Sequence, residues 1–252
     1  ENELIESKKI AKVFWRKPFN CNLFLDNYLE SEVRYIFREI FNTFSRQGKA
    51  ILVIPNIENH LGKLVQMQVA AKYFHVPKWE VSVNKKFSSG SAVVKSLSSE
   101  TTSDNKVIYT TKVEKDTLDP QYPWFTQDLI VANQDITAVF VNGKIFAYQL
   151  ARKNGLIDWR KEINREKQDW IIHCLPKEMH QKIILFMNDL GLKFGRLDFL
   201  LSETSYSFLE VNPNGQWAWL DIENKNGLME AMIQELSPDT ENLASVKILN
   251  RI

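Results

Sequence analysis

Two carboxylates and an amide interrupt apolar stretches near the end of the chain, where a buried strand alone would carry Val, Ile or Leu. The segment RLDFL contains Asp198, and the segment SFLEVN contains Glu210 and Asn212. Successive side chains of a strand point to opposite faces, so Phe208, Glu210 and Asn212 are expected to share one face. Glu210 and Asn212 are therefore predicted to be neighbours.

The two segments are predicted to pair as a hairpin around SETSYS. A symmetric register centred near Thr204 sets Asp198 opposite Glu210, with Cβ atoms roughly 5 Å apart. Like charges so close repel each other unless a positive charge lies between them. A divalent cation is the economical answer. Two carboxylates and an amide oxygen suit Mg²⁺ or Mn²⁺, whereas a zinc site would call for His or Cys.

The alternative is that Asp198 and Glu210 are ordinary exposed residues on the polar face of an amphipathic hairpin. The sequence that follows, NPNGQWAW, favours the metal site. Pro213 forces Asn212 to be extended, and an Asn-Gly turn comes directly after it. Strand ends beside tight turns are places where phosphate chemistry is often built.

Composition limits the classes of partner. The 252 residues include 32 Lys and Arg against 31 Asp and Glu, so no global basic field recruits nucleic acid or an anionic membrane. A hydrophobic content of 44% can fill a core. We find no apolar run near the roughly 20 residues that span a bilayer and no signal-peptide pattern. Cys21 and Cys174 lack CxxC spacing, so we expect buried free thiols in a cytoplasmic protein.

The first 76 residues alternate between strand and helix patterns, which predicts an α/β layer. Residues 30–48 place apolar side chains on one helical face and end at Gly48, a common C-terminal cap. We expect this face to be core, with an apolar groove as the alternative. The other predicted elements are strands over 11–19 and 50–55 and a helix carrying Leu61, Leu64, Met67, Ala71 and Phe74.

From about residue 77 the pattern changes to short strands, which predicts a mixed, mostly antiparallel region. The Asn142-Gly143 pair signals a tight hairpin. A helix is expected between Pro176 and Gly191. The remaining predicted elements are strands over 79–83, 91–97, 106–113, 135–141 and 144–150 and a last helix over 226–236.

At this point the sequence resembles the ATP-grasp superfamily, whose final core strands carry an Asp, then Glu-x-Asn, to hold the magnesium ions of MgATP. FLEVNPNGQW resembles more specifically the microviridin-type or graspetide ligases, which cross-link side chains of ribosomally made precursor peptides. The resemblance covers most of the chain. The motifs that follow the family order are VFWRKPF, the K-x₆-A-A-x₄-V-P run ending at Pro77, VVKSLSS, VIYTTKV, FTQDLI, DWR and FGRLDF.

The resemblance implies an α/β fold of the α+β ATP-grasp type, with two α/β subdomains gripping ATP. It also implies a preceding N-terminal α/β domain, of which only part is present. We expect residues 1–76 to be its remnant with linking helices, residues 77–130 the small subdomain up to the adenine hinge, and residues 131–252 the large subdomain with the metal site.

The resemblance also implies roles in nucleotide binding. Lys95 approaches the ATP phosphates, with a solvent-reaching edge-strand lysine as the alternative. Oxygens of Gln127 and Asp128 accept from the adenine amino group, the Leu129 amide donates to the ring, and Leu129 and Ile130 sandwich the base.

Two further positions are implied with open alternatives. Asp135 is a ribose or phosphate-side contact, or an ordinary turn aspartate. Arg160 meets the γ-phosphate and the acyl-phosphate, or is a surface arginine at a helix start. The sequence departs from the family at Thr137, where the family often has Arg after Asp/Glu-Ile, and in KKFSSGSAVVK, which is shorter than expected.

The implied activity is an ADP-forming ligase that closes rings in a precursor peptide. Its cofactors are ATP and Mg²⁺, with two ions expected and Mn²⁺ as a substitute, and its partner is a precursor peptide with a leader segment. A homodimer is expected, with no nucleic acid and no membrane. The alternatives are a ligase that adds amino acids to a peptide or protein end and a catalytically silent nucleotide-binding module. A protein kinase is disfavoured because HRD, DFG and a glycine-rich loop are missing.

Overall fold

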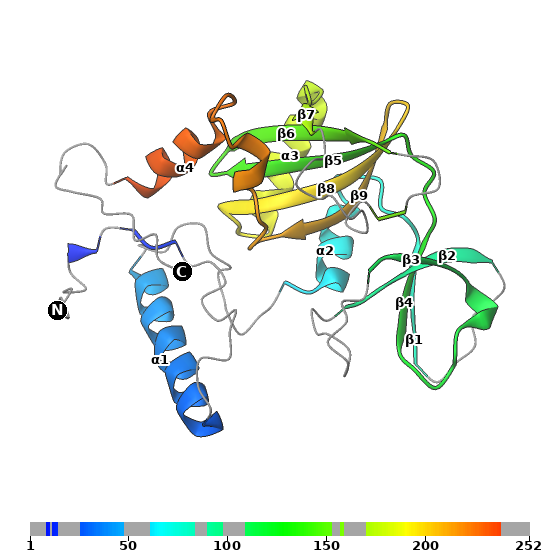
Figure 1. The fold of residues 1–252 in the computed structure, drawn as a ribbon, viewed down its shortest axis with the longest axis horizontal. Coiled ribbons are helices and arrows are strands. Elements are labelled where there is room, and N and C mark those ends of the chain that lie inside the picture. Colours follow the sequence, from blue (N-terminus) through cyan, green and yellow to red (C-terminus); the bar gives the residue numbers. More distant parts are fainter. Residues whose placement is uncertain are drawn as a thin grey trace.

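A computed structural model describes residues 9–10, 12–14, 26–47, 61–83, 90–97, 109–152, 157–158 and 170–237. In these residues the fold is built from two antiparallel β-sheets with flanking helices (Figure 1). The strand predicted over 50–55 lies outside the described residues, as does most of the strand predicted over 11–19. Within the described ranges, we find no helix with the length and apolar character that crossing a bilayer requires.

The larger sheet has the strand order β7-β6-β5-β8-β9, with β5 at its centre. The predicted β5–β6 hairpin is confirmed, because Asn142 and Gly143 connect the two strands with φ of 42° and 94°. Positive φ at both positions is what Asn-Gly favours. The strands are β5 (Gln134–Val141), β6 (Lys144–Ala151), β7 (Ile171–Ile172), β8 (Phe194–Ser202) and β9 (Ser205–Asn212).

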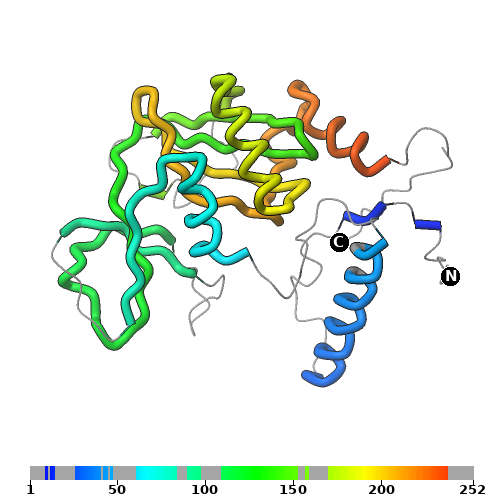
Figure 2. The backbone as a smooth tube through the Cα atoms, turned by 180° about the vertical axis from the view of Figure 1, so that it is seen from behind, coloured from blue at the N-terminus to red at the C-terminus, as the bar shows by residue number. Residues whose placement is uncertain are grey.

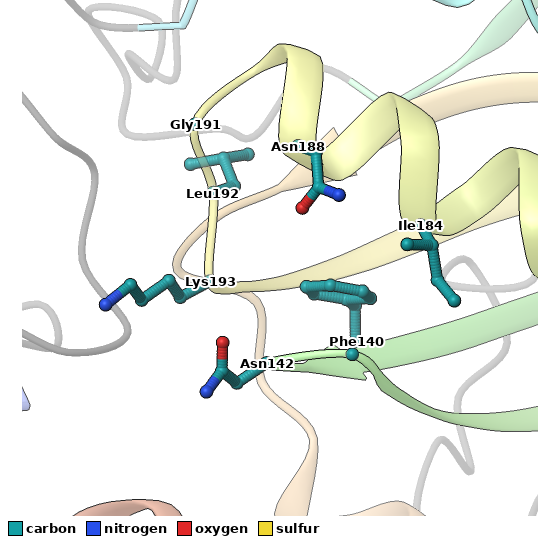
Figure 3. Close-up of a pocket in the computed structure, with 8 residues that line it drawn as sticks. Phe140, Asn142, Ile184, Asn188, Gly191, Leu192 and Lys193 are labelled. Atoms are coloured by element: carbon teal, nitrogen blue, oxygen red, sulfur yellow. The ribbon is translucent and has the colours of Figure 1, made fainter.

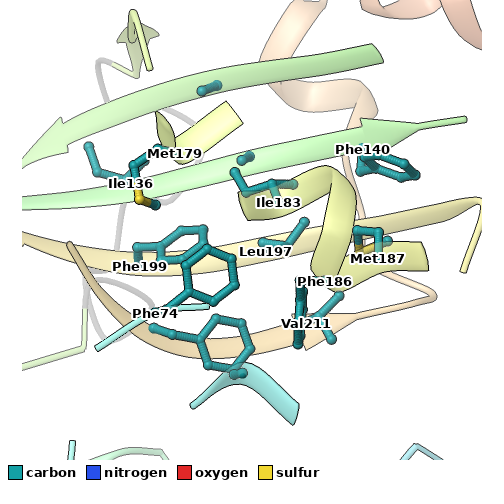
Figure 4. Close-up of a cluster of buried hydrophobic side chains, with 14 of the residues drawn as sticks. Phe74, Ile136, Phe140, Met179, Ile183, Phe186, Met187, Leu197, Phe199 and Val211 are labelled. Carbon is teal, nitrogen blue, oxygen red and sulfur yellow. The ribbon is translucent and has the colours of Figure 1, made fainter. Parts of the chain in front are cut away.

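Helix α3 (Lys177–Asp189) covers one face of the larger sheet, and the main core lies between them (Figures 2 and 4). Its predicted limits are confirmed, since Pro176 is the N-cap and Gly191 follows the last turn with φ of 65°. The helix buries Met179, Ile183, Phe186 and Met187 in a core that also contains Ile136, Leu197, Phe199, Phe208 and Val211.

Helix α2 (Lys63–Ala70) covers the edge strand β9, whose backbone would otherwise lack partners on that side. The Val211 amide donates to Gln66 Oε1 at 2.9 Å. Further along the edge, the Phe208 amide donates to the His75 carbonyl at 2.8 Å. These two hydrogen bonds attach the segment around α2 to the larger sheet.

The predicted helical pattern through Phe74 is too long, because α2 ends at Ala70. Phe74 instead enters the core beyond the helix end. Its ring stacks on Phe208 with centroids 5.7 Å apart and makes an edge contact with Phe199 at 5.2 Å. The apolar spacing identified a buried residue correctly but not its secondary structure.

The other face of the larger sheet carries a second apolar cluster over part of its area. Tryptophan and leucine side chains of the short helix η5 (Ala218–Asp221) and leucine and methionine side chains of helix α4 (Leu228–Leu236) cover it, together with Trp217 just before η5. The cluster comprises Val139, Val141, Tyr148, Phe194, Trp217, Leu220, Leu228 and Met232. The predicted last helix is thus confirmed, and the rest of this face is left for polar residues.

The smaller sheet has the strand order β1-β4-β2-β3 and lies at the opposite end of the molecule from helix α1 (Asn27–Arg46) (Figures 1 and 2). The chain enters it after Val76 and leaves it through residues 129–133. These two crossings are joined where the Asp128 amide donates to the Lys78 carbonyl at 2.8 Å. The strands are β1 (Trp79–Ser82), β2 (Ser91–Lys95), β3 (Thr111–Glu114) and β4 (Trp124–Asp128).

Two predictions about burial are wrong. The apolar face of α1 was expected to be core, but Ile36 is 52% exposed, Phe37 40% and Ile40 43%, and Phe44 near the end of the helix is buried. Cys174 was expected to be a buried thiol, but it is exposed, because it precedes α3 in a connection at the surface. Cys21 lies outside the described residues.

Candidate functional site

The site begins with the β8–β9 hairpin, which sets Asp198 opposite Glu210 as predicted. The predicted symmetric register holds from Arg196 to Asp198, but it is shifted by one residue between Phe199 and the turn. Ser202 pairs with Ser205, and Phe199 pairs with Phe208. Continued regularly, that register would set Asp198 opposite Leu209. A β-bulge between Asp198 and Phe199 absorbs one residue of β9 and restores the pairing with Glu210.

Because of the bulge, the side chains of β9 share faces differently from the prediction. Phe208 was expected to share a face with Glu210, but it is fully buried with Val211 in the core beneath α3. One extra residue between Phe208 and Glu210 reverses the alternation, because side chains in a strand follow a period of two. Phe208 therefore fills the core while Glu210 pairs with Asp198.

Asp198 lies in a row of polar side chains that crosses the sheet. Thr137 is its partner on β5, and the Thr137 hydroxyl donates to Asp198 Oδ1 at 2.8 Å. On the other side, Arg196 Nη2 donates to Asp198 Oδ2 at 3.0 Å, while Arg196 Nη1 donates to the Gln216 carbonyl at 3.1 Å. Arg196 is only 9% exposed. Thr137 and Arg196 thus contact the two oxygens of the same carboxylate.

Glu210 has its own positive partner, Lys63, the first residue of α2. The Lys63 ammonium and the Glu210 carboxylate form an ion pair, and both side chains are about one-fifth exposed, at 22% and 23%. This contact was not predicted from the sequence, although Lys63 is the first residue of the K-x₆-A-A-x₄-V-P run. Arg196 was not predicted either, although a spacing of two from Asp198 on a strand places both on one face.

Asp198 and Glu210 do not require a metal ion to balance their charges, since Arg196 and Lys63 already supply positive charge. Among the described residues, no three His, Cys, Asp or Glu side chains are grouped as a metal site. The candidate donors remain two carboxylates and the Asn212 amide, an all-oxygen set that fits a hard cation. Asp198 is 22% exposed and Glu210 23%, so both are accessible to an ion from solvent.

The turn after the hairpin closes tightly on the site. Asn212 Oδ1 accepts from the Asn214 amide at 3.0 Å, and the Asn212 carbonyl accepts from the Gly215 amide at 3.1 Å. A Cβ atom at Gly215 would lie 2.7 Å from Arg196 Cβ and 3.2 Å from the Asn212 carbonyl oxygen. The predicted turn is confirmed, and its glycine allows the backbone to approach the Arg196 side chain.

Asp135 lies on β5 two residues before Thr137, so it is a strand residue and not a turn aspartate. Arg152 Nη1 donates to Asp135 Oδ1 at 3.0 Å. Burial is the main cause that raises the Asp135 pKa to about 6, and the negative charges of Asp198 and Asp158 raise it further, while Arg152 lowers it. The charges of Asp135 and Asp198 therefore influence each other.

On the smaller sheet, Lys95 and Gln127 lie on the same face. Lys95 pairs with Phe125 and Val93 pairs with Gln127, so Lys95 is a diagonal neighbour of Gln127. Gln127 is 1% exposed, its Nε2 lies 3.6 Å from Met67 Sδ, and its Oε1 finds no hydrogen-bond partner in the described part of the chain. A buried acceptor without a partner is unfavourable, and a ligand N–H would satisfy it.

Helix α2 contacts both the Asp198–Glu210 pair on the larger sheet and Gln127 on the smaller sheet. Lys63 contacts Glu210, and Met67 contacts Gln127. These two helix residues are one turn apart, so they lie on the same side of α2, about 6 Å along its axis. The structure therefore brings Gln127 and the Asp198–Glu210 pair to one helix, although they come from different sheets.

The other predicted nucleotide residues are placed as follows. Asp128 ends β4, and Leu129 and Ile130 are half-buried in the connection between the sheets. Arg160 lies outside the described residues.

A separate cavity of about 400 Å³ lies between the β5–β6 turn and the end of α3 (Figure 3), and none of the predicted site residues lines it. Its lining consists of Phe140, Asn142, Gly143, Ile184, Asn188, Gly191, Leu192 and Lys193.

Comparison with known proteins identifies the fold. No protein-family model and no curated protein matches the sequence. Among solved structures, macrocyclase MdnC bound with precursor peptide MdnA from Microcystis aeruginosa MRC has a TM-score of 0.70 and 22% identity, over 91% of this chain and 78% of that one. The Chryseobacterium gregarium RiPP-associated ATP-grasp ligase, in complex with ADP and a leader and core peptide, has a TM-score of 0.73 and 20% identity, over 93% and 79%.

A more distant match is the D-alanine–D-alanine ligase from Bacillus anthracis, with a TM-score of 0.56 and 11% identity over 84% of this chain and 83% of that one. All three identities lie well below a quarter, so the likeness is one of fold. The chain has the ATP-grasp fold, and the predicted mixed α/β fold class is confirmed.

Proposed function

We propose that this protein is an ATP-dependent peptide macrocyclase of the graspetide type. It activates Asp or Glu side chains of a ribosomally made precursor peptide and joins them to Ser or Thr hydroxyls as ω-esters, or to Lys amines as ω-amides. The observation that carries the proposal is the pairing of Asp198 with Glu210 on the larger sheet of an ATP-grasp fold. The solved structures that share this fold include ligases bound to precursor peptides.

In this proposal Asp198, Glu210 and Asn212 hold Mg²⁺, with a second ion and Mn²⁺ as further expectations. A bound Mg²⁺ supplies positive charge to the phosphate oxygens of ATP. The accessible oxygens of Asp198 and Glu210 on one sheet face support this role. Arg196 and Thr137 fix the Asp198 carboxylate by one hydrogen bond to each of its oxygens.

The nucleotide lies between the two sheets in this proposal. Gln127 Oε1 accepts from the adenine amino group, and the Asp128–Ile130 connection borders the base. Lys95, on the same face as Gln127, reaches the phosphates, and Asp135 lies toward the ribose or phosphates. Arg160 is proposed for the γ-phosphate by family resemblance. The buried, unpaired oxygen of Gln127 supports the adenine position.

The reaction follows from the need to give a carboxylate a leaving group. An oxygen of the peptide carboxylate forms a bond to the γ-phosphorus, the bond to the bridging oxygen breaks, and ADP leaves. The hydroxyl or amine of a second peptide side chain then forms a bond to the acyl carbon, loses its proton, and expels phosphate. The residues of this chain contribute by positioning and by stabilising negative charge, and none acts as a nucleophile.

The test is the intact mass of a candidate precursor peptide encoded beside the gene and co-expressed with the protein. We expect the loss of one water for each ring with the wild type and an unchanged mass with Glu210→Gln, which removes the charge and keeps the volume. Glu203→Gln, in the exposed turn of the same hairpin, is the matched control and should retain ring closure.

Two other results would replace the proposal. A gain in mass equal to whole amino-acid residues would identify a ligase that extends peptide ends. ATP binding with no ADP release in the presence of the peptide would identify a silent nucleotide-binding module. Unfolding of the Glu210→Gln variant would show instead that this carboxylate is structural.

A further inference from the structure

The contact between Lys63 and Glu210 joins residues 147 positions apart and occupies one of the proposed metal ligands. Helix α2 holds Lys63 in place, because Gln66 Oε1 accepts from the Val211 amide at 2.9 Å, and Gln66 Nε2 donates to the Leu61 carbonyl at 2.8 Å. Gln66 is itself 5% exposed. The ammonium of Lys63 is therefore delivered to Glu210 by a fixed helix.

Arg196 and Lys63, the cations that the described part of the chain places at the carboxylate pair, differ in how firmly they are held. The Arg196 guanidinium makes hydrogen bonds to Asp198 and to the Gln216 carbonyl, and the turn at Gly215 packs against its Cβ. Lys63 reaches Glu210 with a single ammonium at the end of a flexible four-carbon stem. Arg196 is thus built into the sheet, whereas the Lys63 side chain can withdraw without moving the backbone.

We infer that Lys63 is a positioning residue that acts as an internal counter-cation, which a divalent metal ion must displace from Glu210. This inference rests on the proposed function, because it takes Glu210 to be a metal ligand. An ammonium and a metal ion compete for the same carboxylate oxygens and repel each other when close together. Free metal therefore binds weakly while Lys63 is in place.

Nucleotide changes this balance. Once displaced from Glu210, the Lys63 ammonium remains tethered near the carboxylate pair by its side chain. The ATP triphosphate there offers it a new anionic partner. The metal brought by ATP therefore displaces Lys63 more readily than free metal does. Lys63 in this way makes metal loading depend on nucleotide and keeps the carboxylate pair neutralised before ATP arrives.

The test measures free Mn²⁺ by electron paramagnetic resonance in titrations of the wild type and Lys63→Met, without nucleotide and with ATP. We expect Lys63→Met to bind Mn²⁺ about tenfold more tightly than the wild type without nucleotide. With ATP the difference should shrink or reverse. The control is Lys72→Met, which removes the ammonium that pairs with Asp189 at 3.0 Å just after α2, and it should match the wild type throughout.

Two further results would decide against the inference. Equal Mn²⁺ affinities of the wild type and Lys63→Met without nucleotide, with both proteins binding Mn²⁺ when ATP is present, would remove the role of Lys63 and leave the metal site intact. If Lys63→Met binds Mn²⁺ more tightly than the wild type by the same factor with and without ATP, Lys63 does not make metal binding depend on nucleotide.

If neither protein binds Mn²⁺ even with ATP, Glu210 is not a metal ligand, and the proposed function loses its metal site together with the inference. Lys63→Arg covers the case in which Lys63→Met unfolds. This variant keeps the charge and should bind Mn²⁺ as weakly as the wild type without nucleotide, so tighter binding by Lys63→Arg would contradict the inference.

Discussion

The carboxyl group of Asp135 is buried beside Arg152, and its pKa is raised to about 6 from 3.8, mainly by burial. Between these values the folded protein keeps a proton that the unfolded chain has released. The free energy of unfolding due to this group therefore falls as pH rises from about 4 to about 6. Asp135→Asn should gain stability relative to the wild type over this range, by roughly 3 kcal/mol at most.

The measurement is urea unfolding of both proteins at pH 4, 5, 6 and 7. Carboxyl groups that are not coupled to Asp135 titrate equally in the two proteins, so the difference between their unfolding free energies reports Asp135 together with its coupled neighbours Asp198 and Asp158. A difference that stays constant from pH 4 to 7 would contradict a raised pKa.

Single residues also show where sequence reasoning ends. The pairing of Asp198 with Glu210 could be predicted because a period of two and a hairpin signal are local properties. Arg196 could have been found by the same period, since it lies two residues before Asp198. Lys63 could not, because nothing near either residue in the sequence encodes a contact over 147 positions.

At the scale of elements, the bulge in β9 makes a prediction about deletion. Removing Leu209 would let Glu210 follow Phe208 directly, so that Phe199 still pairs with Phe208 and Asp198 with Glu210 in a regular ladder. We expect this variant to stay folded, with a loss of about 1 kcal/mol for the half-buried leucine. Deleting Val211 instead should unfold the protein, because it moves Asn212 into the core position opposite Leu197.

Thermal unfolding followed by circular dichroism compares the two deletions. Similar and large losses in both would mean that the bulge itself is needed for the hairpin. The bulge was not predictable, because Leu209 is an ordinary strand residue and carries no glycine signal. Helix α1 was predicted in position, but the exposure of its apolar face was not, since periodicity identifies an apolar face without saying what covers it.

For the whole molecule, the larger sheet and its core are completed by segments on both sides of the smaller sheet. Met67, Ala70 and Phe74 precede it in the chain, and the strands from β5 onward follow it. The two crossings lie together at Lys78 and Asp128, whose backbone hydrogen bond measures 2.8 Å. Replacing residues 79–128 with a short Gly-Ser linker should therefore leave the larger sheet folded.

Calorimetry of this shortened chain should show one cooperative transition, and ATP binding should be lost with Lys95 and Gln127. A chain that gives no transition would show that the smaller sheet is required for the stability of the larger one. The full-length protein with the linker sequence added at its end is the control for the effect of the linker itself.

The split core has a consequence during synthesis. Phe74 leaves the ribosome before the smaller sheet is made, whereas its ring partners Phe199 and Phe208 leave after it. Until then the apolar side of α2 has no sheet to cover it, and its side chains are exposed on the nascent chain. The time that translation takes from Phe74 to Phe208 therefore sets how long these side chains are exposed.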